Sequence, residues 1–103
     1  MTPSRARIEL PRDQIAEFCR RHHIRWLALF GSVLRDDFTP ESDIDVLVDF
    51  EPEHRYTYFT LAQIERELSG LLGRKADVHV PKSLHWFIRD KVLGQAEAVY
   101  DGA

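Results

Sequence analysis

The sequence predicts an α/β or α+β protein, in which helices pack against a β-sheet. Two observations support this class: stretches with apolar residues at helical spacing alternate with short, strongly apolar stretches, and turn-forming residues separate them. The composition of the 103-residue chain, 44% hydrophobic and 30% charged, is typical of a folded globular protein. We therefore expect a single domain over residues 1–103, with residues 1–10 loosely held.

The first part of the chain predicts a helix followed by a buried strand. The helix is expected from Pro11 to about residue 23, because proline suits the first helical position and apolar residues then recur at spacings of three and four. Residues 24–30 are rich in large apolar side chains without a helical period, which predicts the strand. A helical turn and a loop are then expected up to Glu41. The inner stripe of the helix consists of Ile15, Phe18, Cys19 and His22.

Residues 42–50 alternate between apolar and acidic side chains, which predicts a strand with two unlike faces. One face carries Ile44, Val46, Val48 and Phe50, and the other carries Asp43, Asp45, Leu47 and Asp49.

The second half predicts two helices and two short strands. A helix over residues 56–72 is expected to end at Gly73, and a strand follows over residues 75–80. Ser83 is expected to cap the third helix, and residues 98–100 to form a last strand. The inner residues of the two helices are expected to be Leu61, Ile64, Leu68, Leu71 and Leu72 in the first, and Leu84, Phe87, Ile88 and Val92 in the second.

Charge and cysteine content argue against several classes of protein. The formal net charge of −3 argues against a dedicated nucleic-acid binder, so direct nucleic-acid binding is not expected. The lone Cys19 cannot form an internal disulfide, and no apolar run approaches the roughly 20 residues of a membrane span. The N-terminus lacks the pattern of a signal peptide. These features favour a cytoplasmic protein.

Three aspartates are candidate metal ligands. Residues i and i+2 of a strand point the same way, with Cα atoms about 6.6 Å apart, so the carboxylates of Asp43 and Asp45 can converge on one small volume. Two anions held together need a cation or a proton between them, and hard oxygen ligands favour Mg²⁺. If the strand of Asp77 pairs beside theirs, three acids converge, which is the layout of two-metal phosphoryl chemistry. The alternative for each aspartate is a solvated acid at a strand end.

Gly31 and Ser32 are candidate phosphate-binding residues. A glycine lets backbone N–H groups approach a phosphate closely, and the serine adds a hydroxyl donor. Arg35, one turn further on, can reach the same phosphates. Gly-Ser alone is a common turn, so the signal comes from its combination with the two aspartates that follow after ten residues.

These segments resemble the minimal nucleotidyltransferases of the DNA polymerase beta superfamily, over residues 26–100. The resemblance implies a mixed β-sheet flanked by helices. It also implies binding of a nucleoside triphosphate with two Mg²⁺ ions, and transfer of a nucleoside monophosphate with release of pyrophosphate. The segments similar to the family's motifs are Leu29-Phe30-Gly31-Ser32-Val33-Leu34-Arg35, Ser42-Asp43-Ile44-Asp45-Val46-Leu47-Val48 and Ala76-Asp77-Val78.

The resemblance also implies a role for each residue. Asp43 and Asp45 would hold both metal ions, while Asp77 would complete the metal site and orient or deprotonate the acceptor. Gly31 and Ser32 would hold the β- and γ-phosphates, and nucleotide binding would extend to two further residues, Arg35 and Ser42.

Two residues depart from the family's pattern. Asp36 stands where relatives often carry glycine, and adds charge near the phosphate loop. His79 stands where the strand of the third acid usually continues with an apolar residue. Neither departure removes a metal ligand.

Short members of this family often act as the antitoxin of a small helical HEPN-type protein, and some resemble protein AMP-transferases that modify this partner. The resemblance therefore implies transfer of AMP from ATP to a HEPN toxin within a hetero-oligomer. Size independently favours a partner, because about 100 residues can build the metal and triphosphate site but hardly an acceptor domain as well. The alternatives are a non-catalytic antitoxin that masks its partner, and transfer to a tRNA end or to a small molecule.

Several residues outside these motifs have two interpretations. The basic run at residues 20–25 suits a solvated helix end better than a nucleic-acid footprint. Core packing is expected for the aromatic residues near position 58, ahead of stacking on a base or contact with a partner. His79 is the one histidine with a possible catalytic role, because it can share a face with Asp77. The aromatic residues are Tyr56, Tyr58 and Phe59, while Trp26 and Trp86 are expected in the core or an interface, and Cys19 in a structural position.

Overall fold

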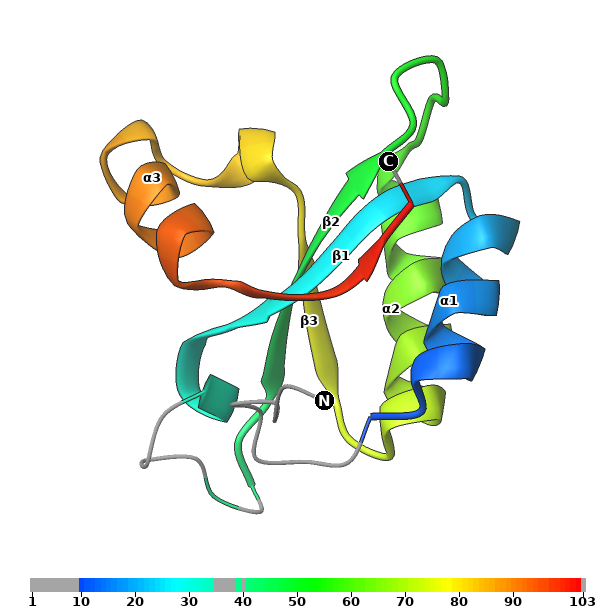
Figure 1. Ribbon diagram of the computed structural model, residues 1–103, viewed down its shortest axis with the longest axis horizontal. Helices are drawn as coiled ribbons and strands as arrows, with labels where there is room; N and C mark the ends of the chain where they lie inside the picture. Colours follow the sequence, from blue (N-terminus) through cyan, green and yellow to red (C-terminus); the bar gives the residue numbers. More distant parts are fainter. Residues whose placement is uncertain (1–9, 35–38, 40, 103) are drawn as a thin grey trace.

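The alternation that predicts a two-faced strand at residues 42–50 produces one of the two inner strands of the sheet. The computed structural model describes residues 10–34, 39 and 41–102, and in them four strands form one sheet in the order β3-β2-β1-β4 (Figure 1). The observed strand begins at Ile44, two residues after the expected start at residue 42. The strands are β1 (Ile24–Phe30), β2 (Ile44–Phe50), β3 (Ala76–His79) and β4 (Glu97–Asp101).

The sheet is mixed, which confirms the expected fold class. β1 pairs in antiparallel fashion with both β2 and β4, whereas β2 and β3 are parallel. Parallel neighbours need a long crossover connection, and a helix, α2 (Tyr58–Leu72), provides it between β2 and β3. The two strands that carry the candidate acids are therefore neighbours in the sheet.

Two helices cover one face of the sheet and bury the core. α1 (Arg12–Arg21) and α2 lie side by side on that face, whereas α3 (Trp86–Gln95) lies on the other side of the sheet (Figure 1). The expected stripes of α1 and α2 are confirmed, with His22 and the leucines at the ends of the α2 stripe only partly buried. The buried core between helices and sheet contains Ile15, Phe18, Cys19, Ile24, Leu27, Leu29, Val33, Ile44, Val46, Val48, Phe50, Ile64, Leu68, Ala76 and Val80.

Local side-chain chemistry sets the two ends of α2. The hydroxyl of Thr57 accepts a hydrogen bond from the backbone N–H of Thr60, and the Thr60 hydroxyl accepts one from the N–H of Thr57. This reciprocal cap begins the helix at Tyr58, two residues after the expected start. Gly73 ends the helix as expected, because it adopts the left-handed conformation (φ 71°) that glycine reaches without steric cost.

The third helix differs from the expectation in its cap and in its burial. The hydroxyl of Ser83 donates to the carbonyl oxygen of Val80 within the short 3₁₀ turn η2 (Pro81–Ser83), so it does not cap α3. None of the α3 residues is buried, and Trp86 is 76% exposed. The expected inner stripe is wrong for Phe87 and Ile88, which are exposed, whereas Leu84 and Val92 are half-buried. Trp86, Phe87 and Ile88 are consecutive, which spreads apolar side chains around the helix.

The aromatic residues at the start of α2 divide into two groups. Tyr56 packs against the core and stacks on Phe50, with ring centroids 4.5 Å apart, as expected. Tyr58 and Phe59 are 84% and 85% exposed, so the prediction of core packing is wrong for both. Phe59 lies on the side of α2 opposite its inner stripe, whereas Tyr58 lies at the border of that stripe beside Leu61 and is still mostly exposed.

Side chains of α2 cover the outer edge of β3. The backbone N–H of Val78 donates to Glu65 Oε2 (3.0 Å), and the N–H of Ala76 donates to Ser69 Oγ (2.9 Å). Edge strands otherwise present open backbone donors that invite pairing with another chain. These two bonds satisfy the donors and fix β3 to α2 on both sides of Asp77, the residue that pairs with Asp45 of β2.

Burial suppresses the reactivity of the one cysteine, as its expected structural role requires. Cys19 is fully buried, and this desolvation raises the pKa of its thiol to about 12, against a smaller opposing effect of the Arg20 charge. A buried thiol with a raised pKa is a poor nucleophile.

No helix in the described residues is long and apolar enough to cross a membrane.

We predict that Cys19 makes stability depend on pH in the alkaline range. The thiol pKa rises from 9.0 in the unfolded chain to about 12 in the fold, so the stabilisation is complete below pH 9 and is lost as pH rises to 12. Urea unfolding should show a loss approaching about 1.4 kcal/mol per pH unit in this window. Cys19→Ala should remove the loss of stability that the thiol causes, and should keep any loss caused by ionisation of the tyrosines. Equal pH slopes for both proteins would contradict the prediction.

Candidate active site

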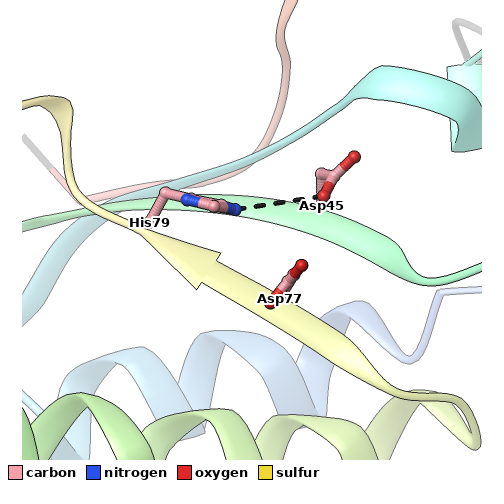
Figure 2. A group of neighbouring side chains, drawn as sticks. All are labelled: Asp45, Asp77 and His79. Carbon is pink, nitrogen blue, oxygen red and sulfur yellow. Dashed lines mark ion pairs between the residues drawn. The ribbon is translucent and has the colours of Figure 1, made fainter. Parts of the chain in front are cut away.

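The parallel register of β2 and β3 brings two of the candidate acids together. Asp45 pairs with Asp77 across the two strands, and the next matching pair on the same face is Leu47 with His79. Because residues two apart in a strand point to the same side, His79 lies on the same face as Asp77. Figure 2 shows the three polar side chains on the side of the sheet that faces away from α1 and α2.

The donor atoms of Asp45, Asp77 and His79 form a compact group. One ligand atom from each residue lies within 4.8 Å of the other two. His79 Nε2 is 3.9 Å from Asp45 Oδ1, and all three residues are half-buried (Figure 2). Two neighbouring carboxylates favour a cation between them, and oxygen donors fit Mg²⁺. The chemistry of the acids therefore fits a divalent metal ion.

Apolar residues form the floor of this site. Leu47 and Ala28 lie opposite each other in β2 and β1 and are fully buried. Phe30, opposite Asp45 in β1, meets the ring of His79 edge to face with centroids 5.5 Å apart. An apolar floor raises the strength of the electrostatic interactions above it, because it keeps water from one side of the acids.

Gly31 touches the acidic group directly. It follows β1 in the left-handed conformation (φ 78°), and a Cβ at this position would collide with Asp45 Oδ2. Only glycine combines this backbone conformation with so close an approach to a side chain. The glycine–serine turn expected to bind phosphates therefore lies beside the acids expected to bind metal.

Asp43 lies outside the compact group. It precedes β2 by one residue, its side chain is exposed, and its Oδ2 is 3.9 Å from Lys75 Nζ. The pleat sets side-chain direction only within the strand, so the i, i+2 relation to Asp45 does not fix where Asp43 points. The structure thus brings together two of the three predicted acids, with His79 beside them.

The other predicted site residues have different surroundings. Ser32 lies next to Gly31 in the 3₁₀ turn η1 (Gly31–Leu34) and is half-buried. The hydroxyl of Ser42 accepts a hydrogen bond from the backbone N–H of Thr39 (3.0 Å), so it is engaged just before β2 begins. The expectations for Arg35 and Asp36 concern positions outside the described residues.

His79 is the member of the group that the sequence motif does not include. The signal was present, since the sequence places His79 two residues after Asp77 on one face. Its distance from Asp45 depends on the pairing of β2 with β3, which the sequence pattern does not show.

The basic run at residues 20–25 is largely paired with acids. Arg25 donates to Asp49 Oδ2 at 2.8 and 3.0 Å, and His23 Nδ1 lies 3.5 Å from Glu51 Oε2. At the end of α1, Arg21 and His22 both contact Glu67 of α2.

A family model identifies the domain. The model described as "Nucleotidyltransferase domain" matches residues 12–99, which contain every described site residue above. The chain belongs to the nucleotidyltransferase family. This membership confirms the resemblance drawn from the Gly31-Ser32, Asp43-Ile44-Asp45 and Asp77 motifs.

Two similar proteins narrow the relationship within this family. The protein adenylyltransferase MntA of Thermococcus cleftensis is 36% identical over 84 residues, which are 82% of this chain and 81% of the relative. A solved structure of a protein assigned as a minimal nucleotidyltransferase superposes with a TM-score of 0.69 at 34% identity, over 84% of this chain and 86% of that one. The nucleotidyltransferase thus has the fold expected of a minimal member of the polymerase beta type.

Two more distant structures share the fold. A chain from a toxin–antitoxin complex with AMP-PNP has a TM-score of 0.72 at 19% identity, over 89% of this chain and 74% of that one. A chain from a complex of a tri-AMPylated HEPN toxin with an MNT antitoxin from Shewanella oneidensis has a TM-score of 0.64 at 18% identity, over 87% and 69%.

We predict opposite effects of alanine at two glycines. Gly31→Ala should destabilise the fold by about 2 kcal/mol, because it strains the left-handed backbone and pushes Asp45 aside. Gly70→Ala, in α2 with open space around its Cβ position, should stabilise by roughly 0.5–1 kcal/mol. Urea unfolding measures both changes. A stability loss no greater for Gly31→Ala than for Gly70→Ala would show that Gly31 does not require glycine.

Proposed function

We propose that this nucleotidyltransferase is a Mg²⁺-dependent protein adenylyltransferase, which moves AMP from ATP to a helical HEPN-type toxin and thereby acts as its antitoxin. The observation that carries the proposal is the pairing of Asp45 with Asp77 beside Gly31. This arrangement combines an acidic metal site with a turn suited to phosphates. The donor and the acceptor follow from the relatives.

The relatives support both substrates. The MntA relative, at 36% identity, is named a protein adenylyltransferase, which favours AMP as the transferred group and a protein as the acceptor. A structural neighbour was solved with AMP-PNP, an analogue of ATP. Another contains an AMPylated HEPN toxin, which favours a partner of that class.

Three carboxylates are proposed to hold two Mg²⁺ ions. Asp45 and Asp77 are already adjacent, while Asp43 is included because it stands two residues before Asp45 in the metal-binding motif. When bound, the ions supply positive charge at the α-phosphate and on the leaving pyrophosphate. Gly31 brings its backbone close to the same volume, where it and Ser32 are proposed to bind the β- and γ-phosphates.

The chain's own residues orient a direct displacement. A hydroxyl oxygen of the acceptor forms a bond to the α-phosphorus of ATP, and the bond from that phosphorus to the bridging oxygen of the β-phosphate breaks. Pyrophosphate leaves with the electron pair, and the hydroxyl proton passes to the carboxylate of Asp77. Asp77 is suited to this role because it lies in the edge strand and is half-buried, on the face of the sheet away from α1 and α2.

We predict that transfer depends on both adjacent acids. With α-³²P-labelled ATP, Mg²⁺ and a HEPN-type protein from the same genome, Asp45→Asn and Asp77→Asn should each lower labelling of the partner at least about a hundredfold. Asp49→Asn is the matched control, because Asp49 lies on the same face of β2 but pairs with Arg25; its labelling should stay within about twofold of the unmodified protein. Equal labelling by all four proteins would refute the assignment.

A second candidate is a non-catalytic antitoxin that neutralises its partner by masking it. The exposed position of Asp43 beside Lys75 favours this alternative, because it leaves the three acids not fully assembled.

Co-expression separates the two candidates. We predict that a toxic HEPN partner stops growth when it is co-expressed with the Asp45→Asn/Asp77→Asn protein, and that the unmodified protein restores growth with the partner AMPylated. Mass spectrometry of the partner provides the second readout. Growth restored by the double variant without any AMPylation would establish masking instead.

A further inference from the structure

His79 is the residue of this site that neither the metal-binding motif nor the proposed reaction uses. It extends from β3 on the same face as Asp77, opposite the buried Leu47 of β2. Its side chain is half-buried and its ring points toward Asp45 (Figure 2). A polar residue in this position therefore faces the acids rather than bulk solvent alone.

We propose that His79 supplies a nitrogen ligand, beside the carboxylates of Asp45 and Asp77, to the divalent cation of this site, and so shifts its preference from Mg²⁺ toward Mn²⁺ and Co²⁺. This inference rests on the proposed function, because it concerns the metal ion of the same site.

The distances suit a shared ion. Ligands of an octahedral divalent ion at about 2.1 Å lie about 3 Å apart when adjacent and about 4.2 Å apart when opposite. The three donor atoms here lie within 4.8 Å of one another, so side-chain movements of roughly half an ångström bring them into that range. The edge-to-face contact between His79 and Phe30 holds the histidine ring beside the acids.

The alternative is a plain histidine–aspartate contact. His79 Nε2 and Asp45 Oδ1 are 3.9 Å apart, which is too long for a hydrogen bond. A direct pair would bring the two atoms to about 2.8 Å, since a charge-assisted hydrogen bond is short. The observed separation instead lies between the adjacent and opposite ligand spacings of one ion.

The donor set predicts the ion preference. Mg²⁺ takes almost only oxygen ligands, whereas Mn²⁺ accepts both oxygen and imidazole ligands and Co²⁺ binds imidazole more strongly still. A site with two carboxylates and one imidazole therefore gains affinity for Mn²⁺ and Co²⁺ from His79, and gains little for Mg²⁺. An apolar residue in this position would remove the difference.

Electron spin echo spectroscopy of the full chain with one equivalent of Mn²⁺ tests the proposal directly. We expect ¹⁴N modulation from a coordinated imidazole, its replacement by the ¹⁵N pattern when histidine is ¹⁵N-labelled, and its loss in His79→Leu. His85→Leu is the control, because His85 is exposed and its side chain makes no capping hydrogen bond at the start of α3; the modulation should persist there. The isotope arm needs no substitution, so it decides the question even if His79→Leu folds poorly.

Calorimetric titration gives the second readout. His79→Leu should weaken Co²⁺ binding at least about tenfold and Mg²⁺ binding less than about threefold. Mn²⁺ that binds the protein but not Asp45→Asn, and shows no ¹⁴N modulation, would overturn the role of His79 and leave the proposed function intact. Mn²⁺ binding that is equal in Asp45→Asn would overturn both.

Discussion

The site depends on the parallel register between β2 and β3. Residues on the two strands match one to one, so that Asp45 lies opposite Asp77 and the apolar Val46 lies opposite Val78. A slip of one residue would turn every side chain of β3 to the other face and place Asp77 in the core. The burial of Ala76 and Val80 on the helix side opposes that slip, so packing on one face fixes the geometry of the acids on the other.

The pairing of Asp45 with Asp77 also places demands on the residues around the two strands. Two carboxylates side by side repel each other, and this cost is offset only when a cation or a proton is shared between them. Gly31 can approach the pair because it has no side chain, and its left-handed backbone turns the chain away from β1 at that point. At the outer edge of β3, Glu65 and Ser69 accept hydrogen bonds from its backbone and hold the strand in place.

Much of the fold could be predicted because the central segments follow simple periodic patterns. The alternation from Ile44 to Phe50 and the apolar stripe of α2 each determine which side of the element faces the core. α3 could not be predicted in the same way, because Trp86 and Phe87 are apolar without a partner surface in the described part of the chain. Apolar character predicts burial only where another element supplies the opposing face.

The candidate site was partly predictable for a related reason. Asp45 and Asp77 belong to strands whose faces follow from the pattern, and the structure places them together. Asp43 precedes its strand, so the pleat does not set the direction of its side chain. The hydroxyl of Ser42, which is expected to bind nucleotide, instead accepts a hydrogen bond from the backbone of Thr39. The proximity of His79 to Asp45 follows from strand pairing, which connects residues distant in the sequence.

The central claim is that folding joins an acidic pair and a glycine turn into one site for a metal-bound triphosphate. Anomalous diffraction from crystals grown with Mn²⁺ and a non-hydrolysable ATP analogue measures this directly. We predict a manganese peak within coordination distance of both Asp45 and Asp77, with the triphosphate against Gly31 and Ser32. A peak bound to other residues, or a triphosphate on the side of the sheet covered by α1 and α2, would contradict the account.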